Sequence, residues 1–285
     1  MEIVIHQFHT TRGQRFIDLA ATLADDFAQC AAQHDEDESF PHENYARLKD
    51  SGYTIMTIPE ELGGNGACLL QRMKAQEPPR QGCGPTALAI NMHFNAVGLL
   101  IDLWRKFQDS KRADILRQIA AERMICGGSA SELDNAIPVL RPRATAERVD
   151  GGWRVSGRKI ISTQSIALDR YFSEAPWQEG PAGDTIVSFL IPPDPPGLTF
   201  KDDWYTMGLR ATASRGTELT NVFVPESAAT LQRPAFTRGG ITNLFLRAPF
   251  TIAAPYIEFA VAARDFVVGF MRERPRFPLN KPMSH

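Results

Sequence analysis

Apolar residues recur every three to four positions through the first 123 residues, which is the period of a helix that buries one face. The clearest run, residues 13–34, places Phe16, Leu23 and Phe27 on a single side. Turn-forming glycines and prolines separate this run from the next ones. The pattern predicts an N-terminal helical domain over residues 1–123, with helices at 13–34, 43–51, 67–80, 84–107 and 112–123.

From residue 124 the pattern changes to short runs of alternating polar and apolar residues, separated by Gly, Pro and Asp. The most distinct pair is a hairpin within residues 144–165, where Asp150-Gly151 separates two alternating runs. Gly157 interrupts the second run, as a bulge or bend does. Seven such runs indicate a barrel or a sandwich, and we expect a middle β-barrel domain over residues 124–233. The runs are 125–132, 140–149, 153–163, 170–173, 185–192, 198–204 and 218–225.

The helical period returns after Pro225. Residues 244–271 are apolar at helical spacing, with a kink or break expected at Pro249 or Pro255. They predict the start of a C-terminal helical bundle in a third domain, residues 234–285. Helices that are separated from strands along the chain indicate the α+β class.

Composition narrows the function classes. The 285 residues are 43% hydrophobic, enough for a large core, and the net charge of −2 does not favour nucleic acid or an anionic membrane as partner. Four cysteines without a Cys-x-x-Cys pair predict reduced thiols in a cytoplasmic protein. The first residues lack the apolar run of a signal peptide, and residues 250–270 carry a proline and charges unsuited to a membrane span.

Two polar segments of the N-terminal half call for separate interpretation. Residues 59–66 are glycine-rich, but they form neither a Gly-x-Gly-x-x-Gly after a strand nor a P-loop, so we expect no Rossmann or P-loop nucleotide site. The acidic run at residues 34–38 is interpreted as a solvated connection between helices.

The order of elements and several short motifs together resemble the acyl-CoA dehydrogenase superfamily. The most specific motif is DGGWRVSGRK at residues 150–159, which is similar to the family's Asp-Gly-Trp hairpin that ends in lysine. Ser-Ala-Ser-Glu at 129–132 stands where the family has Thr-Glu-Pro. The other matching motifs are at residues 40–43, 58–66, 207–214, 222–226 and 273–277.

The resemblance implies a flavin, FAD or alternatively FMN, between the β domain and the helices. Small hydroxyls suit the polar edge of a flavin, because they offer a donor or acceptor without bulk. Without the resemblance, the same hydroxyls are interpreted as ends of strands. The implied cofactor-binding residues are Ser129, Ala130, Ser131, Ile161, Ser162, Thr163 and Arg274.

Two of these residues and one segment outside them differ from or extend the family pattern. Ile161 replaces the family's ring-stacking tryptophan, and the family's Gly-Ser phosphate contact falls near Ala136-Ile137, where it is lost. Arg274 matches an arginine that contacts the FAD pyrophosphate of a neighbouring subunit, a task suited to a guanidinium. The alternative for Arg274 is a surface arginine in a basic tail.

Three functions remain open. The first is oxidation of an acyl-CoA thioester, with an electron-transfer flavoprotein as partner. The second is a monooxygenase that takes reduced flavin from a flavin reductase and uses O2, with His93 as its catalytic residue beside Ser162. The alternative for His93 is a core histidine. The third is a non-catalytic fragment or subunit.

The resemblance also implies a C-terminally truncated chain, since family members continue for several helices beyond the position of His285. Those helices carry the catalytic glutamate and the subunit interface. We therefore expect poor activity from this chain alone, and a homo-oligomer where the bundle is completed. An exposed apolar face near Phe259, Val261, Phe266, Val267 and Phe270 is a further expectation.

Overall fold

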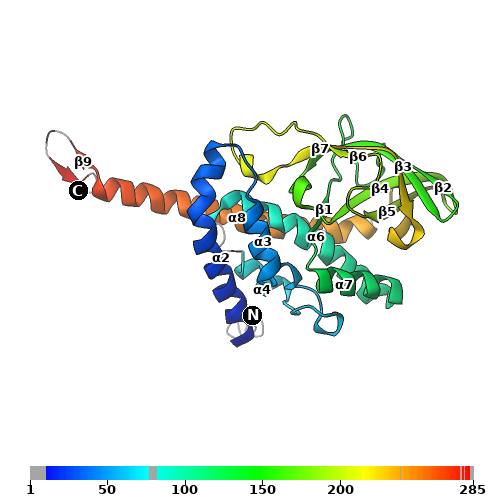
Figure 1. Ribbon diagram of the computed structural model, residues 1–285, viewed down its shortest axis with the longest axis horizontal. Coiled ribbons are helices and arrows are strands. Elements are labelled where there is room, and N and C mark those ends of the chain that lie inside the picture. Colours follow the sequence, from blue (N-terminus) through cyan, green and yellow to red (C-terminus); the bar gives the residue numbers. More distant parts are fainter. Residues whose placement is uncertain (1–10, 77–81, 238, 277, 279, 283–285) are drawn as a thin grey trace.

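The computed structural model describes residues 11–76, 82–237, 239–276, 278 and 280–282. Helices gather at one side of the molecule and strands at the other, and a last long helix follows the strands (Figure 1). The α+β class is therefore confirmed. The element type changes between residues 122 and 126 and again between 234 and 239, while the division into three domains stays a prediction.

The N-terminal helices pack through the apolar faces that their spacing predicts. The longest of the first group buries Phe16, Leu23 and Phe27 against Phe94 of a later helix. The third helix, Leu69–Lys74, is shorter than the predicted 67–80, and residues 77–81 lie outside the described residues. The helices are α2 (Thr11–Glu36), α3 (His42–Asp50), α4 (Leu69–Lys74), α6 (Gly84–Phe107) and α7 (Ser110–Glu122), with 3-10 turns η1 (Tyr53–Ile55) and η2 (Glu60–Leu62).

Helix α6 is the central helix of this layer. In the part of the chain that the structure describes, it alone has the length and apolar composition of a membrane span. However, 67% of that stretch is buried inside the protein, as expected of a core helix. It packs against α7, against the long last helix and against the first strand.

The strands form two four-stranded sheets rather than a barrel. One sheet has the order β1-β4-β5-β8 and the other β2-β3-β7-β6, and the described residues show no pairing that closes them. The β-barrel expectation was therefore wrong, since each sheet keeps two edge strands. The strands are β1 (Cys126–Gly128), β2 (Thr145–Val149), β3 (Gly152–Ser162), β4 (Arg170–Gly180), β5 (Gly183–Ile191), β6 (Leu198–Phe200), β7 (Arg215–Pro225) and β8 (Ala229–Pro234).

A shared core holds the two sheets face to face. Trp153 of β3 is fully buried and meets the rings of Trp177 and Phe189 from the other sheet edge-on, at centroid distances of 5.1 and 5.7 Å. Such pairs stabilise beyond the area they bury. All neighbouring strands pair antiparallel except β1 and β4, which are parallel.

The expected hairpin is present. β2 pairs with β3 around a turn in which Gly151 has φ +73°, a conformation that favours glycine. The register against β7 shifts between Val155 and Gly157, so the predicted bulge is confirmed. A Cβ at Gly157 would lie 2.6 Å from the Ala144 Cβ, which explains why the bulge position lacks a side chain.

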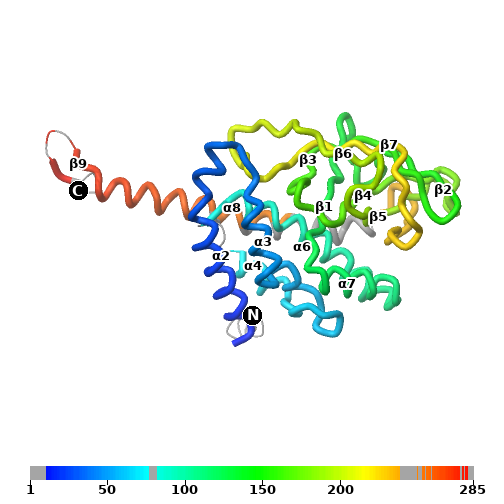
Figure 2. Tube along the Cα trace, in the orientation of Figure 1, coloured from blue at the N-terminus to red at the C-terminus, as the bar shows by residue number. Residues whose placement is uncertain are grey.

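The last helix, α8 (Gly239–Glu273), is continuous through Pro249 and Pro255, where a kink or break was expected. It runs past α6 and projects beyond the body of the molecule (Figures 1 and 2). A short pair, β9 (Pro275–Arg276) and β10 (Lys281–Pro282), follows. The described residues contain this one C-terminal helix and no bundle.

Candidate active site

The loop after β1 and the end of β3 meet at one edge of the β sheets. The Ile160 amide donates to the Ser131 carbonyl at 3.0 Å. The Ser129 hydroxyl donates to the Ile160 carbonyl at 2.5 Å and accepts from the Ser131 amide at 3.1 Å. Hydrogen bonds thus join two segments about thirty residues apart. One of them directly follows β1, the strand that packs against α6.

Ile161 has an unusual backbone at this edge. Its φ is +61°, in the left-handed region that a β-branched residue rarely adopts. The register of β3 against β7 shifts at this point, between Lys159 and Ser162. As a result Ile161 is 50% exposed while Ser162 turns fully inward. Backbone outliers of this kind gather at functional sites.

Ser162 is used inside the β domain. Its hydroxyl lies 2.6 Å from the Thr217 Oγ1 and 3.3 Å from the Tyr171 hydroxyl. These bonds hold the residue after the strained Ile161. A ligand at the edge would therefore meet the backbone of Ser162 rather than its side chain.

Thr163 ends a chain of three hydroxyls. Thr212 and Ser214 lie 2.8 Å apart, and the Ser214 hydroxyl donates to the Thr163 Oγ1 at 3.0 Å. Because Thr163 accepts in this bond, its own proton is available to a further acceptor. The sequence places Thr212 and Ser214 in the family-like motif at 207–214, but nothing in it assigned them to the site.

Gln164 ties this edge to the helical layer. Its side-chain oxygen accepts from the Tyr45 hydroxyl of α3 at 3.0 Å, and its amide donates to the Cys126 carbonyl of β1 at 3.2 Å. Its backbone amide donates to the Thr212 carbonyl at 2.8 Å. The residue is fully buried, so all three bonds are shielded from water.

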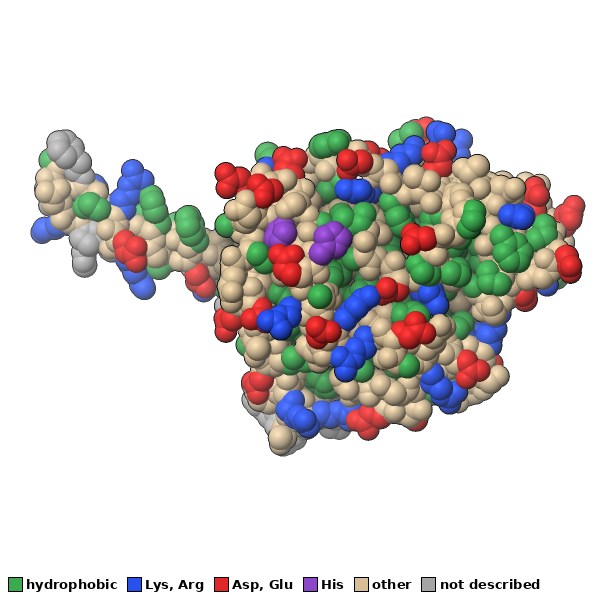
Figure 3. Space-filling view, in the orientation of Figure 1, with side chains coloured by type: hydrophobic (Ala, Val, Ile, Leu, Met, Phe, Trp, Pro, Cys, Tyr) green, Lys and Arg blue, Asp and Glu red, His purple; other side chains and the backbone are tan. Residues whose placement is uncertain are grey.

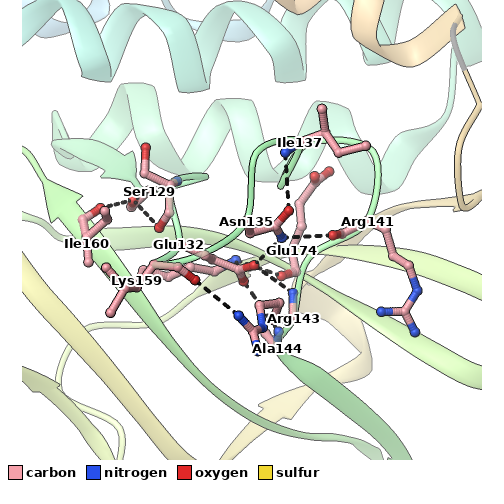
Figure 4. A network of polar contacts seen from close by, with 12 residues as sticks. Ser129, Glu132, Asn135, Ile137, Arg141, Arg143, Ala144, Lys159, Ile160 and Glu174 are labelled. Carbon is pink, nitrogen blue, oxygen red and sulfur yellow. Dashed lines mark hydrogen bonds and ion pairs between the residues drawn. The ribbon is translucent and has the colours of Figure 1, made fainter.

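A buried ion pair closes the loop between β1 and β2. Lys159 Nζ lies 2.6 Å from the Glu132 Oε1, and the two side chains are 1% and 2% exposed (Figure 4). The same carboxylate accepts from the amides of Arg143 at 2.6 Å and Ala144 at 3.3 Å, and from the Asn135 side chain at 2.8 Å. Burial raises the pKa of Glu132, but the hydrogen bond and charge of Lys159 outweigh this and hold the pKa below its usual value.

The Glu132–Lys159 pair fixes both halves of the edge. Glu132 follows Ser131 directly, and Lys159 precedes Ile160. Each partner therefore anchors the segment that carries its side of the site. Both residues stand inside the motifs that suggested the family, yet their contact joins residues 27 positions apart and no local pattern predicts it.

His93 lies beneath the site and is fully buried in α6. Its Nε2 is 2.7 Å from the Thr54 carbonyl, to which it donates, and its Nδ1 accepts from the Cys126 amide at 3.0 Å. Burial lowers the pKa of His93 to about 4, so the ring is neutral near pH 7. Both ring nitrogens are thus engaged in joining α6 to η1 and β1.

Ala130 and Ser131 belong to the edge, whereas Arg274 does not. Ala130 is exposed and Ser131 half-buried at the edge itself. Arg274 stands between α8 and β9, with its guanidinium 5.0 Å from the Phe270 ring centroid. Strand β9 lies away from the two four-stranded sheets (Figure 1). Within one chain, the structure therefore brings together the six residues of 129–131 and 161–163 but not Arg274.

The edge suits a flat, partly polar ligand. Its segments carry exposed apolar side chains, with Ile161 at 50% exposure on β3 and Leu133 at 70% and Ile137 at 52% in the loop after Ser131. The polar groups beside them are neutral hydroxyls and backbone amides and carbonyls. This combination fits a flavin ring, which needs apolar contact on its face and neutral partners at its polar edge.

Comparisons with known proteins identify the family. A family profile described as "Acyl-CoA dehydrogenase, N-terminal domain" matches residues 11–122. "Putative acyl-CoA dehydrogenase YdbM" of Bacillus subtilis (strain 168) is 34% identical over 279 residues, covering 95% of this chain and 70% of its own length.

Two further relatives are named as other kinds of enzyme, one a nitrososynthase and one a monooxygenase. "Amino sugar nitrososynthase DnmZ" of Streptomyces peucetius is 28% identical, over 72% of this chain and 50% of its own length. "Dibenzothiophene monooxygenase" of Mycolicibacterium goodii is 28% identical, over 73% of this chain and 49% of its own. The chain thus spans about half the length of these two relatives.

The solved structure of FMN-bound TdsC from Paenibacillus sp. A11-2 superimposes with a TM-score of 0.80. It is 25% identical, and the match covers 94% of this chain and 68% of TdsC. The arrangement of helices and paired sheets is therefore one already known from a flavin-binding protein.

Proposed function

The chain belongs to the acyl-CoA dehydrogenase superfamily, and from this we propose that it is a flavin-dependent oxidoreductase acting on a small-molecule substrate. The residues that would hold the flavin ring are the edge residues 129–131 and 161–163. When bound, a flavin supplies hydride acceptance or, once reduced, reaction with O2. The chain's own residues position that ring and exclude water from one of its faces.

The observation that carries this proposal is the hydroxyl chain that ends at Thr163. Thr212 and Ser214 are 1% and 5% exposed, so they orient Thr163 from inside the protein. Thr163 then presents its O–H at the site, next to the strained and exposed Ile161. A fixed neutral donor beside an apolar surface is what a polar ring atom of a flavin requires.

Between the two reactions we favour acyl-CoA dehydrogenation. His93 is the chain's own candidate for handling oxygen chemistry, but both of its nitrogens are occupied and its pKa of about 4 keeps it neutral. A proton-transfer role would require one of those bonds to break. The 34% identity to a protein named as an acyl-CoA dehydrogenase, over most of this chain, points the same way.

The monooxygenase remains the second candidate. It is favoured by the 25% identity to FMN-bound TdsC and by the dibenzothiophene monooxygenase match. We expect FAD as the cofactor of the dehydrogenase and FMN as that of the monooxygenase. An electron-transfer flavoprotein, or a flavin reductase, would be the corresponding partner, and the four cysteines, all without disulfides, fit a cytoplasmic location.

Flavin binding by the purified chain tests the site. Titration with FAD and with FMN, followed by flavin fluorescence, should show saturable quenching. Thr163→Val should weaken binding about tenfold, the order expected from loss of one hydrogen bond. Thr199→Val, an exposed threonine on β6, is the matched control and should bind as the parent does. Equal binding by both variants would remove Thr163 from the site.

The reaction is tested separately on the flavin-loaded chain. Anaerobic bleaching of the flavin absorbance by an acyl-CoA would support dehydrogenation. Oxygen uptake with added reduced FMN and substrate, without such bleaching, would support the monooxygenase. Absence of any flavin binding would instead favour the third reading, a non-catalytic chain.

A further inference from the structure

Three side chains of metal-ligating type meet where α2 approaches α3. Cys30 and His34 come from the last part of α2, and Glu43 comes from the first turn of α3. Their ligand atoms, one sulfur, one ring nitrogen and one carboxylate oxygen, all lie within 4.8 Å of one another. None of the three belongs to the candidate active site. We call this group the α2–α3 triad.

The backbone makes the triad possible. Cys30 and His34 are four residues apart on one helix, so their side chains lie on the same face, one turn from each other. Residues 37–41 turn the chain and bring Glu43 against that face, where its Oε1 is 2.6 Å from the His34 Nε2. Histidine and acidic side chains are exposed together on the face formed by α2 and α3 (Figure 3).

Thiolate, imidazole and carboxylate are all ligands of Zn²⁺, with bonds of about 2.0–2.3 Å in tetrahedral sites. Such bonds place neighbouring ligand atoms roughly 3.4 Å apart. The His34–Glu43 distance of 2.6 Å is shorter than this, and the widest separation of the triad is at most 4.8 Å. Small side-chain rotations therefore reach the required geometry without moving either helix.

Supporting hydrogen bonds orient the triad. The His34 Nδ1 is 2.7 Å from the Ser39 hydroxyl, which leaves Nε2 to face Glu43. The Cys30 sulfur is 3.6 Å from the Asn44 Oδ1, and Asn44 is in turn held by the Thr86 hydroxyl at 3.0 Å. The Ser39 contact is of the kind that fixes a ring in metal sites. The Asn44 contact uses the Cys30 S–H as donor, so it orients the sulfur in the metal-free protein and is given up when the thiol loses its proton.

We propose that the α2–α3 triad binds one Zn²⁺ ion through the Cys30 Sγ, the His34 Nε2 and a Glu43 carboxylate oxygen. The fourth position is open to solvent, since the Glu43 side chain is 55% exposed. Binding forms three metal–ligand bonds, breaks the Cys30 S–H bond and replaces the His34–Glu43 hydrogen bond. The thiol proton passes to solvent, and the ring proton moves from Nε2 to Nδ1, which then donates to the Ser39 hydroxyl. The ion joins α2 to α3 and so stabilises the layer that carries Tyr45.

The surroundings of Cys30 keep its thiol protonated in the metal-free protein. Burial and the neighbouring Glu43 raise the pKa of Cys30 to about 11, so the thiol is protonated until a cation displaces the proton. The carboxylate that opposes the thiolate in the metal-free protein becomes its fellow ligand once Zn²⁺ is present.

Cobalt substitution tests the site on the purified 285-residue chain. Co²⁺ should produce near-ultraviolet absorption from thiolate-to-cobalt charge transfer, with saturation at one ion per chain and displacement by added Zn²⁺. Cys30→Ser should abolish this absorption. Cys68→Ser, which removes another partly buried free thiol, should leave it unchanged.

Two further variants separate ligand loss from misfolding. Glu43→Gln keeps the size of an exposed side chain and should weaken Zn²⁺ binding, while far-ultraviolet circular dichroism stays unchanged. Ser39→Ala should cost about 10–100-fold in affinity, as loss of an outer hydrogen bond does. Absence of charge-transfer absorption in the parent chain, or equal Zn²⁺ binding by folded Glu43→Gln, would overturn the proposal and leave the triad an ordinary His–Glu ion pair.

Discussion

At the scale of single residues, the Glu132–Lys159 pair carries the greatest energetic consequence. Both charges are almost fully removed from water and depend on each other for compensation. Removing one partner of a buried pair is far more costly than removing both, because it leaves an uncompensated charge inside the protein.

We expect Glu132→Gln to lower the free energy of unfolding by about 3–5 kcal/mol. The double variant Glu132→Gln/Lys159→Met should recover part of that loss, since no charge remains buried. The control is Arg158→Met, at the position directly before Lys159. Arg158 is exposed and pairs with Glu218, so its loss should change the free energy of unfolding little. Urea unfolding measures all three, and equal losses from the single and double variants would contradict the argument.

His93 predicts a pH dependence of stability. Its pKa is about 4 in the folded protein and 6.5 ordinarily, so between these values the unfolded chain binds a proton that the folded chain does not. Stability contributed by the neutral ring is therefore complete above about pH 6.5 and is lost as pH falls toward 4, by roughly 3 kcal/mol.

The measurement is urea unfolding of the parent chain and of His93→Gln at several pH values. Subtracting the two series cancels the other titrating groups. The advantage of the parent over His93→Gln should shrink between pH 7 and pH 4. A constant difference would mean that folding does not change the pKa of His93.

Only part of the candidate site could be predicted from the sequence. The resemblance located residues 129–131 and 161–163, which the structure joins at one edge. Thr212, Ser214 and Gln164 were not predicted, because their roles arise from contacts with residues up to 119 positions away. Such contacts exist only after the sheets and helices have packed, and no local spacing encodes them.

At the scale of elements, the short strand β1 positions the loop of residues 129–131. Gly128 makes this possible, since a Cβ there would lie 1.9 Å from the Phe172 carbonyl oxygen of β4. The parallel pairing of β1 with β4 therefore requires glycine at this position.

Gly128→Ala should destabilise the protein by about 1–3 kcal/mol, the range typical of overpacking, and weaken flavin binding as well. The control is Gly208→Ala, because an added Cβ at Gly208 meets nothing within 4 Å. Thermal unfolding and the flavin titration give the two readouts. An unchanged midpoint for Gly128→Ala would show that β1 can separate from β4 without cost.

The helices were predicted better than the strands, for a physical reason. A helix buries one face along many residues, so its period is visible over 24 residues of α6. Strand β1 has three residues and β8 six, too few for alternation to be distinct. β8 was missed because its residues do not alternate between buried and exposed. Closure of the sheets depends on pairing between distant edges rather than on any pattern within a strand.

At the scale of the whole molecule, helices and sheets are held together by charge as well as by packing. Arg210, from the loop before β7, lies 3.0 Å from Asp35 and 3.3 Å from Glu38. The acidic run at residues 34–38 was interpreted as solvated, but Asp35 and Glu38 have a partner in Arg210, and His34 has partners in Ser39 and Glu43. The run therefore also joins the end of α2 to the β domain.

The projecting part of α8 leaves apolar side chains in solvent. Phe266 is 74% exposed, Val267 53% and Phe270 45%, as expected from the sequence. Phe259 and Val261, expected on the same face, are half-buried. A contiguous apolar surface favours association. We expect the purified chain to self-associate in a concentration-dependent way.

Phe266→Ser should shift the mass measured by light scattering toward the monomer. Tyr205→Ser, which removes an equally exposed aromatic residue, at 74%, from a loop of the β domain, should not. A monomeric parent chain at all concentrations would contradict the prediction.

The loop closed by Glu132 also has a consequence for how amide protons exchange with solvent. Residues 129–144 contain no helix or strand, yet the amides of Arg143 and Ala144 donate to a carboxylate that is itself buried. Exchange at these two amides requires their bonds to the buried carboxylate to open, which is unfavourable while Glu132 stays paired with Lys159. In deuterated water these two amides should therefore retain their protons longer than the other amides of this irregular loop.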